Sequence, residues 1–238
     1  MKAFLTAEWR NLILANYEFD PEILEKYLPK HTELDFWNGT CYVSLVGFLF
    51  QNTRVSGLRI PWHVNFPEVN LRFYVRHKNE QGEWQRGVVF IKEIVPKPAI
   101  SLVANTLYGE HYQTMPMRYL WKSSKELMVS YDWKYRNKWH RLAVEADYQA
   151  QEIPIGGEEE FITEHYWGYT KTPRGSTMEY GVEHPRWRVH LVQSFDIEVD
   201  MGDLYGADFE HIAKQIPQSV FLAEGSPIIV RQGRKISR

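Results

Sequence analysis

The chain has 238 residues, of which 44% are hydrophobic and 24% are charged, and its formal net charge is −2. This composition excludes an intrinsically disordered protein, and the near-neutral charge argues against a nucleic-acid partner, which needs a basic face. The single cysteine, Cys41, excludes an intramolecular disulfide. No apolar run approaches the roughly 18 residues of a membrane span, and the N-terminus lacks the apolar stretch of a signal peptide. We expect a cytoplasmic bacterial protein that folds as one domain over residues 1–238 and binds neither nucleic acid nor membrane.

In chain order, most of the sequence predicts strands. They are expected at 5–19, at 41–50 with a bend at Gly47, in a hairpin over 68–95 around a turn at 80–83, and at 127–136, 139–150, 178–183, 187–200 and 218–230. Short helices are expected from Asp20-Pro21-Glu22 to Pro29, from Pro98 to a closing Gly109, and over 207–215. Many strands with few helices predict a β-rich α+β fold, built on a mostly antiparallel sheet that is closed or nearly closed.

The second arm of the hairpin carries two ionisable residues, Lys92 and Glu93, inside apolar sequence. Strict alternation along a strand would send the two side chains to opposite faces, so one of them should point into the barrel. A buried lysine with a lowered pKa can act as an amine nucleophile. The alternative is a lysine whose charge reaches solvent or pairs across the strands, with Glu68, Arg72 or Arg76 near enough to satisfy either residue.

Two short segments, 164–169 and 179–187, are rich in aromatic, imidazole and carboxyl side chains. If they form neighbouring strands, their rings and polar tips converge as the wall of a small-molecule pocket. A purely structural aromatic cluster is the alternative. Three Glu-His dipeptides lie at 110–111, 164–165 and 183–184, but adjacent strand residues face opposite ways, so no metal site is expected. The sequence also lacks a serine-nucleophile elbow and a phosphate-binding glycine loop, and we expect no cofactor.

Long motifs resemble a known family. The segments FLTAEWRNLILANYEFDPEIL, WNGTCYVSLVGFLF, FPEVNLRFYV, GVVFIKEIVP, EHYWGYT, VEHPRW and SVFLAEGSPIIV are similar to those of the YqjF-like family of uncharacterised bacterial proteins. That family belongs to the acetoacetate-decarboxylase-like superfamily. The resemblance implies a mostly antiparallel barrel or cone around a central pocket, and it leaves a homo-oligomer open, because acetoacetate decarboxylase assembles as one.

The resemblance carries over to the decarboxylase's functional residues only in part. Arg10 matches an arginine of the decarboxylase and is a candidate carboxylate clamp, with a surface ion pair as the alternative. Lys97 matches the Schiff-base lysine after two residues are deleted, but Pro98 replaces the second lysine that follows it. The segment 52–57 lacks the decarboxylase's pocket glutamate. A Schiff-base amine needs a strongly lowered pKa, so we expect no efficient acetoacetate decarboxylase.

These observations predict a central pocket for a small, anionic organic molecule, which serves either ligand binding alone or a lyase-type reaction that does not use the lysine pair. Two alternatives stay open: a Schiff-base decarboxylase of a β-keto acid acting through Lys97 or Lys92, and a structural or interaction protein with a vestigial pocket. The candidate catalytic residues are Lys92, Lys97 and Glu93. The candidate ligand-binding residues are Arg10, Glu68, Arg72, Tyr166, Trp167, Glu179, Tyr180, His184 and Trp187.

Overall fold

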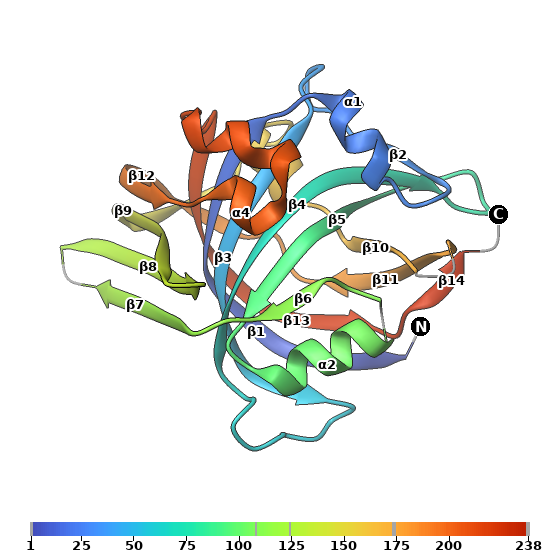
Figure 1. Ribbon diagram of the computed structural model, residues 1–238, viewed down its shortest axis with the longest axis horizontal. Coiled ribbons are helices and arrows are strands. Elements are labelled where there is room, and N and C mark those ends of the chain that lie inside the picture. The colour runs from blue at the N-terminus through green and yellow to red at the C-terminus, as the bar shows by residue number, and fades with distance from the viewer. Residues whose placement is uncertain (1, 108, 124, 173–174, 237–238) are drawn as a thin grey trace.

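The computed structural model (Figure 1) describes residues 2–107, 109–123, 125–172 and 175–236. The strands are β1 (Ala3–Glu18), β2 (Thr32–Leu34), β3 (Tyr42–Val55), β4 (Phe66–Lys78), β5 (Trp84–Val95), β6 (Tyr112–Thr114), β7 (Met117–Ser123), β8 (Glu126–Tyr135), β9 (Lys138–Glu152), β10 (Trp167–Lys171), β11 (Thr177–Glu183), β12 (Arg188–Glu198), β13 (Ser219–Arg231) and β14 (Arg234–Ile236). The helices are α1 (Pro21–Leu24), α2 (Pro98–Leu107), α3 (Glu158–Thr163) and α4 (Met201–Tyr205), with 3₁₀ turns η1 (Glu25–Tyr27) and η2 (Ala207–Lys214). Among these residues, no helix is long and apolar enough to cross a membrane.

The strands form one sheet that curls into a nearly closed ring. Its central order is β11-β10-β5-β4-β3-β1-β13, and β11 also pairs with β13, which brings the two ends of this series together. Strands β12, β9, β8 and β7 continue outward from β13, as Figure 1 shows on its left side. Most pairs are antiparallel, whereas β5 pairs in parallel with β10 and β6. The predicted fold class is therefore confirmed.

The central strands are buried on both faces, which explains their continuous apolar sequence. In β3, Val43 and Leu45 join a core that includes residues of α4 and η2. On the opposite face of the same strand, Val46 and Phe48 join a second core inside the ring. Because successive side chains of a strand point to opposite faces, one strand serves both cores. The second core surrounds the cavity described below.

Several local predictions need correction. Gly47 is required by close packing, because a Cβ there would lie 2.7 Å from Cδ2 of Tyr131. The helix expected at 207–215 is the 3₁₀ turn η2, and α4 precedes it. Strands β2, β6, β7 and β14 and helix α3 were not predicted, and β10 was considered only as a possible strand in 164–169. The three glutamates 158–160 form the first turn of α3, where negative charge favours a helix.

Two β-bulges determine which side chains face the inside of the ring. In the β4–β5 pair, Leu71 lies opposite Lys92 but Arg72 lies opposite Phe90, so Ile91 is an extra residue. In β1, the pairing with β3 shifts after Arg10, next to Asn11 with its positive φ of 56°. A bulge reverses the alternation of faces beyond it. Each bulge therefore changes the face on which the following residues lie.

Candidate functional site

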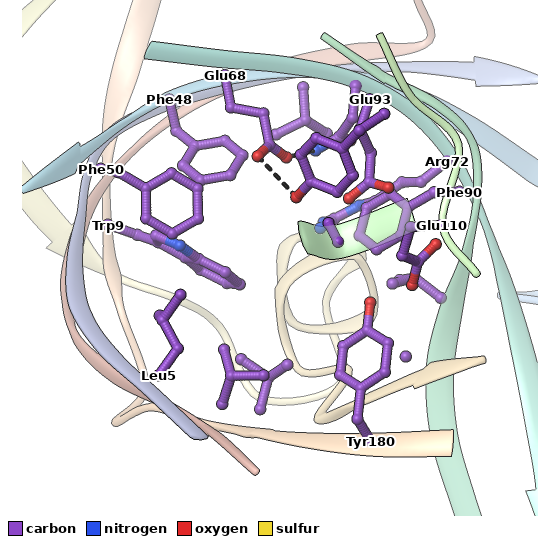
Figure 2. A pocket seen from close by; sticks show the side chains of 18 of the residues that line it. Leu5, Trp9, Phe48, Phe50, Glu68, Arg72, Phe90, Glu93, Glu110 and Tyr180 are labelled. Atoms are coloured by element: carbon purple, nitrogen blue, oxygen red, sulfur yellow. Dashed lines mark hydrogen bonds between the residues drawn. The ribbon is translucent and has the colours of Figure 1, made fainter. Parts of the chain in front are cut away.

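A cavity of about 140 Å³ lies inside the ring of strands. One wall is aromatic: Trp9, Phe48 and Phe50 stand together on one side in Figure 2, and Trp9 meets the two phenyl rings edge-on at centroid distances of 5.2 and 6.0 Å. Residues of α2 (Ile100, Val103 and Ala104) also line the cavity. These rings and aliphatic side chains make a surface that favours the apolar part of a ligand.

Three glutamates line the same cavity on its polar wall. Glu68 comes from β4, Glu93 from β5, and Glu110 from the segment between α2 and β6, and each is 7% exposed or less. Figure 2 shows Glu68 and Glu93 near each other, and the side chains of Glu93 and Glu110 are close enough to share a hydrogen bond. Glu93 faces inward together with Phe90 because the bulge at Ile91 lies between them. Three carboxyls in one desolvated wall are electrostatically costly unless protonated or paired.

Hydrogen bonds hold this carboxyl wall only in part. Glu68 accepts from Nδ2 of Asn70 and from the Tyr112 hydroxyl, both at 3.0 Å, and the latter bond is dashed in Figure 2. Glu110 accepts from Oγ1 of Thr170 at 2.6 Å. Oε2 of Glu93, Oε2 of Glu110 and Oδ1 of Asn70 are buried without a hydrogen bond of good geometry among the described residues. Glu93 and Glu110 nevertheless lie within reach of each other, and the Tyr112 hydroxyl is within reach of Glu93 and the Tyr180 hydroxyl within reach of Glu110. The wall therefore retains acceptor capacity that the protein itself leaves unused.

Burial raises the pKa of all three carboxyls, and repulsion between carboxylates adds to this at Glu68 and Glu93. Burial raises the pKa of Glu68 to about 7, and the charge of Glu110 adds to the effect. Burial also raises the pKa of Glu110 to about 7. The pKa of Glu93 rises well above its ordinary value through burial and then through the charges of Glu110 and Glu68. The wall thus holds carboxyls that exchange protons near neutral pH.

Arg72 is the cation of the cavity wall. It shares its strand face with Glu68 and Asn70, and its charge lowers the pKa of Glu68 against the effect of burial. Its Nη2 donates to the Ile162 carbonyl at 3.3 Å, and its guanidinium lies 5.6 Å from the Tyr74 ring centroid. Within the described part of the chain, the residues that line the cavity include three glutamates and this arginine but no lysine.

His165 is a further polar residue of the wall. Its Nε2 lies 3.4 Å from Oδ2 of Asp35, which also accepts from Nε of Arg86 at 2.6 Å. Burial lowers the pKa of His165 to about 4, so the ring is neutral at pH 7. The contact with Asp35 assigns the ring proton to Nε2 and leaves Nδ1 as an acceptor. This Nδ1 is buried without a partner among the residues the structure describes.

The structure divides the candidate residues into two groups. The cavity wall includes Glu68, Arg72, Glu93, Trp167, Tyr180, His184 and Trp187. The segments 164–169 and 179–187 do run side by side, since β10 pairs with β11. Outside the wall lie Arg10, Lys92, Lys97, Tyr166 and Glu179.

Lys92 and Arg10 point away from the cavity. Nζ of Lys92 donates to the Leu204 carbonyl and lies 5.9 Å from the Tyr205 ring centroid, on the other face of the sheet. Burial lowers the pKa of Lys92, but its amine does not face the cavity. Trp9 occupies the inner face of β1, so its neighbour Arg10 turns outward and pairs with Glu8. The prediction that Arg10 clamps a carboxylate in the cavity is therefore wrong.

The other three residues have different neighbours. Lys97 lies between β5 and α2, where its carbonyl accepts from the first turn of α2. Glu179 alternates with the inward-facing Tyr180 and accepts from Nε of Arg234 at 2.5 Å. The Tyr166 hydroxyl donates to Glu164, and its ring lies in an outer hollow that shares Trp167 and His184 with the cavity wall.

Sequence reasoning missed the residues Asn70, Glu110, Tyr112 and His165. The alternation of Glu68 and Arg72 along one strand face could have identified Asn70 between them. In the sequence, Glu110 and His165 stand out only as members of Glu-His dipeptides, whose spacing predicts no metal site. Nothing local to the sequence indicates that both side chains reach the same cavity as Glu93.

Sequence comparisons place the chain among uncharacterised proteins. The profile of the DUF2071 family, described as an uncharacterized conserved protein, matches residues 6–227. The "Uncharacterized protein YqjF" of Bacillus subtilis (strain 168) is 28% identical over 205 residues, which cover 84% of this chain and 79% of YqjF. The resemblance to YqjF-like proteins is confirmed.

Structural comparisons show the acetoacetate-decarboxylase-like fold. The acetoacetate decarboxylase of Legionella pneumophila superposes with a TM-score of 0.66 at 14% identity, covering 99% of this chain and 88% of the decarboxylase. The enduracididine biosynthesis enzyme MppR superposes with a TM-score of 0.71 at 11% identity, and the match covers 100% of this chain and 90% of MppR. That structure holds the condensation product of pyruvate and imidazole 4-carboxaldehyde. An acetoacetate decarboxylase-like enzyme from Sphingomonas wittichii RW1 superposes with a TM-score of 0.67 at 12% identity, and the match covers 100% of this chain and 94% of that enzyme. At these identities the likeness concerns the fold alone.

Proposed function

Because the chain belongs to the DUF2071 family of uncharacterized conserved proteins, we propose its function from the site itself: the protein binds a small organic molecule inside its ring of strands. The observation that supports this most directly is the contrast between the two walls of the cavity. Trp9, Phe48 and Phe50 offer an apolar surface, and Glu93 and Glu110 offer polar groups across the cavity from it. Glu68 joins the two surfaces, because it lies opposite Phe48 on the neighbouring strand. Apolar walls with a few convergent polar groups are typical of small-molecule sites.

The cavity volume sets the size of the ligand. An apolar cavity of about 150 Å³ in another protein binds benzene. The volume of about 140 Å³ found here therefore suits a body on the order of one six-membered ring. The anionic charge that the sequence predicts for the ligand loses support, since Arg10 lies outside the cavity and Arg72 shares the cavity wall with three carboxyls. The wall favours a head group that donates hydrogen bonds over an anionic one.

Benzyl alcohol is a suitable first probe, and it should bind with a dissociation constant on the order of 1 mM, as expected for so small a ligand. Ala104→Phe places a ring from α2 into the cavity and should weaken binding by about tenfold or more. Titration calorimetry or ligand-observed NMR measures both. Ala99→Phe, an exposed position on the same helix, is the matched control. Absence of binding, or equal weakening by both variants, would favour the vestigial-pocket alternative.

The Schiff-base alternative predicts a covalent adduct, and we expect none. No described lysine lines the cavity, and the Lys92 amine is engaged on the opposite face of the sheet. Incubation with acetoacetate and borohydride should leave the mass of the protein unchanged, and carbon dioxide release should equal the blank. Turnover of roughly 1 per second or more, abolished by Lys92→Ala or Lys97→Ala, would contradict this expectation.

A second candidate function is acid–base catalysis of a lyase-type reaction on the bound molecule. The pKa values of Glu68 and Glu110, both raised to about 7, favour it. Carboxyls with a pKa near the working pH are effective general acids and bases. On this proposal the carboxyl wall, and no amine, would carry the chemistry.

A further inference from the structure

Once its carboxyls are ionised, the polar wall of the cavity contains more unused acceptors than donors. Buried acceptor atoms without a hydrogen bond of good geometry among the described residues are Asn70 Oδ1, Glu93 Oε2, Glu110 Oε2 and His165 Nδ1, all on residues that line the cavity. The corresponding buried donors on the wall are Nε1 of Trp9 and Nε of Arg72. Buried polar atoms are normally satisfied, so unused acceptors that border a cavity indicate a ligand that donates to them.

We propose that the cavity takes an organic cation: a molecule with an ammonium or amidinium head at Glu93 and Glu110 and an apolar body against Trp9, Phe48 and Phe50. The inference rests on the proposed function and specifies the ligand class of the same site. An ammonium group brings three hydrogen-bond donors and no acceptor, which matches the excess of acceptors on the wall.

The charge balance of the wall supports the same ligand class. Three carboxyls face one guanidinium, that of Arg72. A bound cation relieves the repulsion among the carboxyls, and it forms charge-assisted hydrogen bonds in a site with little water.

A metal ion does not account for the cluster equally well. Within the described residues, no group of three or more His, Cys, Asp or Glu side chains is arranged to hold one. Of the three carboxyls, Glu68 is already committed to Asn70 and Tyr112, and Glu110 to Thr170. The free oxygens of Glu93 and Glu110 are better suited to the spread donors of an organic cation.

Binding of a cation should release protons. In the empty cavity the carboxyls are held partly protonated by burial and by each other. A cation beside them favours the ionised forms, so affinity should rise as the pH increases from 6 to 8. The charged and titratable groups on the wall are Glu68, Arg72, Glu93, Glu110, Tyr112, His165, Tyr180 and His184. Burial lowers the pKa of both histidines, and that of His165 falls to about 4, so the His165 ring stays neutral across this range.

Three probes of nearly equal size test the proposal: benzylamine, benzyl alcohol and benzoate. Calorimetric titration at pH 7.5 should show that benzylamine binds about tenfold or more tightly than benzyl alcohol, with benzoate weakest. Titrations in buffers of different ionisation enthalpy should show proton release with benzylamine and none with benzyl alcohol. Glu110→Gln, which keeps the shape of the side chain, should remove most of the preference for benzylamine. Glu126→Gln, at an exposed position, should leave it unchanged.

The outcomes separate the two proposals. If benzyl alcohol or benzoate binds as tightly as benzylamine, the cation proposal is wrong and the proposed ligand-binding function stands. If no probe binds, both are wrong. If benzylamine binds best but Glu110→Gln and Glu93→Gln, checked by circular dichroism for native structure, both keep the full preference, the cation is bound elsewhere and the proposal fails.

Discussion

Glu68→Gln should stabilise the protein by on the order of 3 kcal/mol at pH 8 and by little at pH 4.5. Glu68 is buried beside Glu93 and Glu110, and its pKa rises from 4.5 to about 7 on folding. Each unit of difference between folded and unfolded pKa corresponds to about 1.4 kcal/mol. Glutamine has the shape of the protonated side chain but cannot ionise, so the variant avoids the cost of a buried charge.

The direction of this pH dependence follows from the number of protons that the folded and unfolded states bind. Between pH 4.5 and about 7 the folded state holds the Glu68 proton while the unfolded state has lost it. Stability from this group is therefore fully present below pH 4.5 and declines until the pH passes about 7. His165 acts in the opposite direction, because its pKa is lowered to about 4 and protonation in the unfolded state reduces stability below pH 6.5. The difference between wild type and variant isolates Glu68.

Urea unfolding at pH 4.5, 6, 7 and 8 measures this difference. Glu126→Gln, on an exposed position of β8, serves as the control and should follow the wild type at every pH. A difference between Glu68→Gln and wild type that does not grow with pH would show that the carboxyl cluster is not strained. The same result would weaken the electrostatic part of the argument for a cationic ligand.

Gly225→Ala should destabilise the protein by about 3 to 4 kcal/mol. The added methyl group overpacks the site, and the left-handed backbone conformation is strained for alanine. Gly225 lies in β13 opposite Arg10 and has a φ of +76°. A Cβ at this position would lie 2.0 Å from the carbonyl oxygen of Trp9, in the bulged part of β1. The backbone of β1 would have to move, and the Trp9 ring that lines the cavity would move with it.

Thermal or urea unfolding measures the change, and Gly156→Ala provides the matched control. Gly156 has nearly the same φ, +75°, but nothing lies within 4 Å of a Cβ there. The Gly156→Ala variant should therefore lose only about 1 kcal/mol of unfolding free energy, which is the cost of the left-handed conformation alone. Similar losses in the two variants would mean that β1 adapts without strain, and benzyl alcohol binding would then be unaffected by Gly225→Ala.

Features that depend on local sequence could be predicted. The strands around 5–19, 41–50 and 68–95 follow from apolar runs and turn residues, and the scarcity of helices predicted a closed or nearly closed sheet. The signals at Pro21 and Pro98 located the first helical turns of α1 and α2. Edge strand β7 was missed because its apolar side chains face outward, so its pattern does not show a buried face.

The candidate site shows where local patterns stop being sufficient. Sequence alternation could say only that one of Lys92 and Glu93 points inward, and it grouped Phe90 with Lys92. The bulge at Ile91 changed this grouping, so Phe90 and Glu93 face the cavity together and Lys92 faces away. A bulge depends on how two strands pair, which periodicity along one strand cannot reveal.

The sequence by itself determined the family, the strand-rich fold and the position of Glu68, Arg72 and Glu93 within strands, because these depend on residue type and short-range order. Only the tertiary structure decided that Glu110 and His165 join the same wall. Glu110 arrives from the end of α2, and His165 is held by Asp35, 130 residues away. Their raised and lowered pKa values arise from burial and from charges brought together by the closure of the sheet. That convergence is a property of the folded ring and of no single segment.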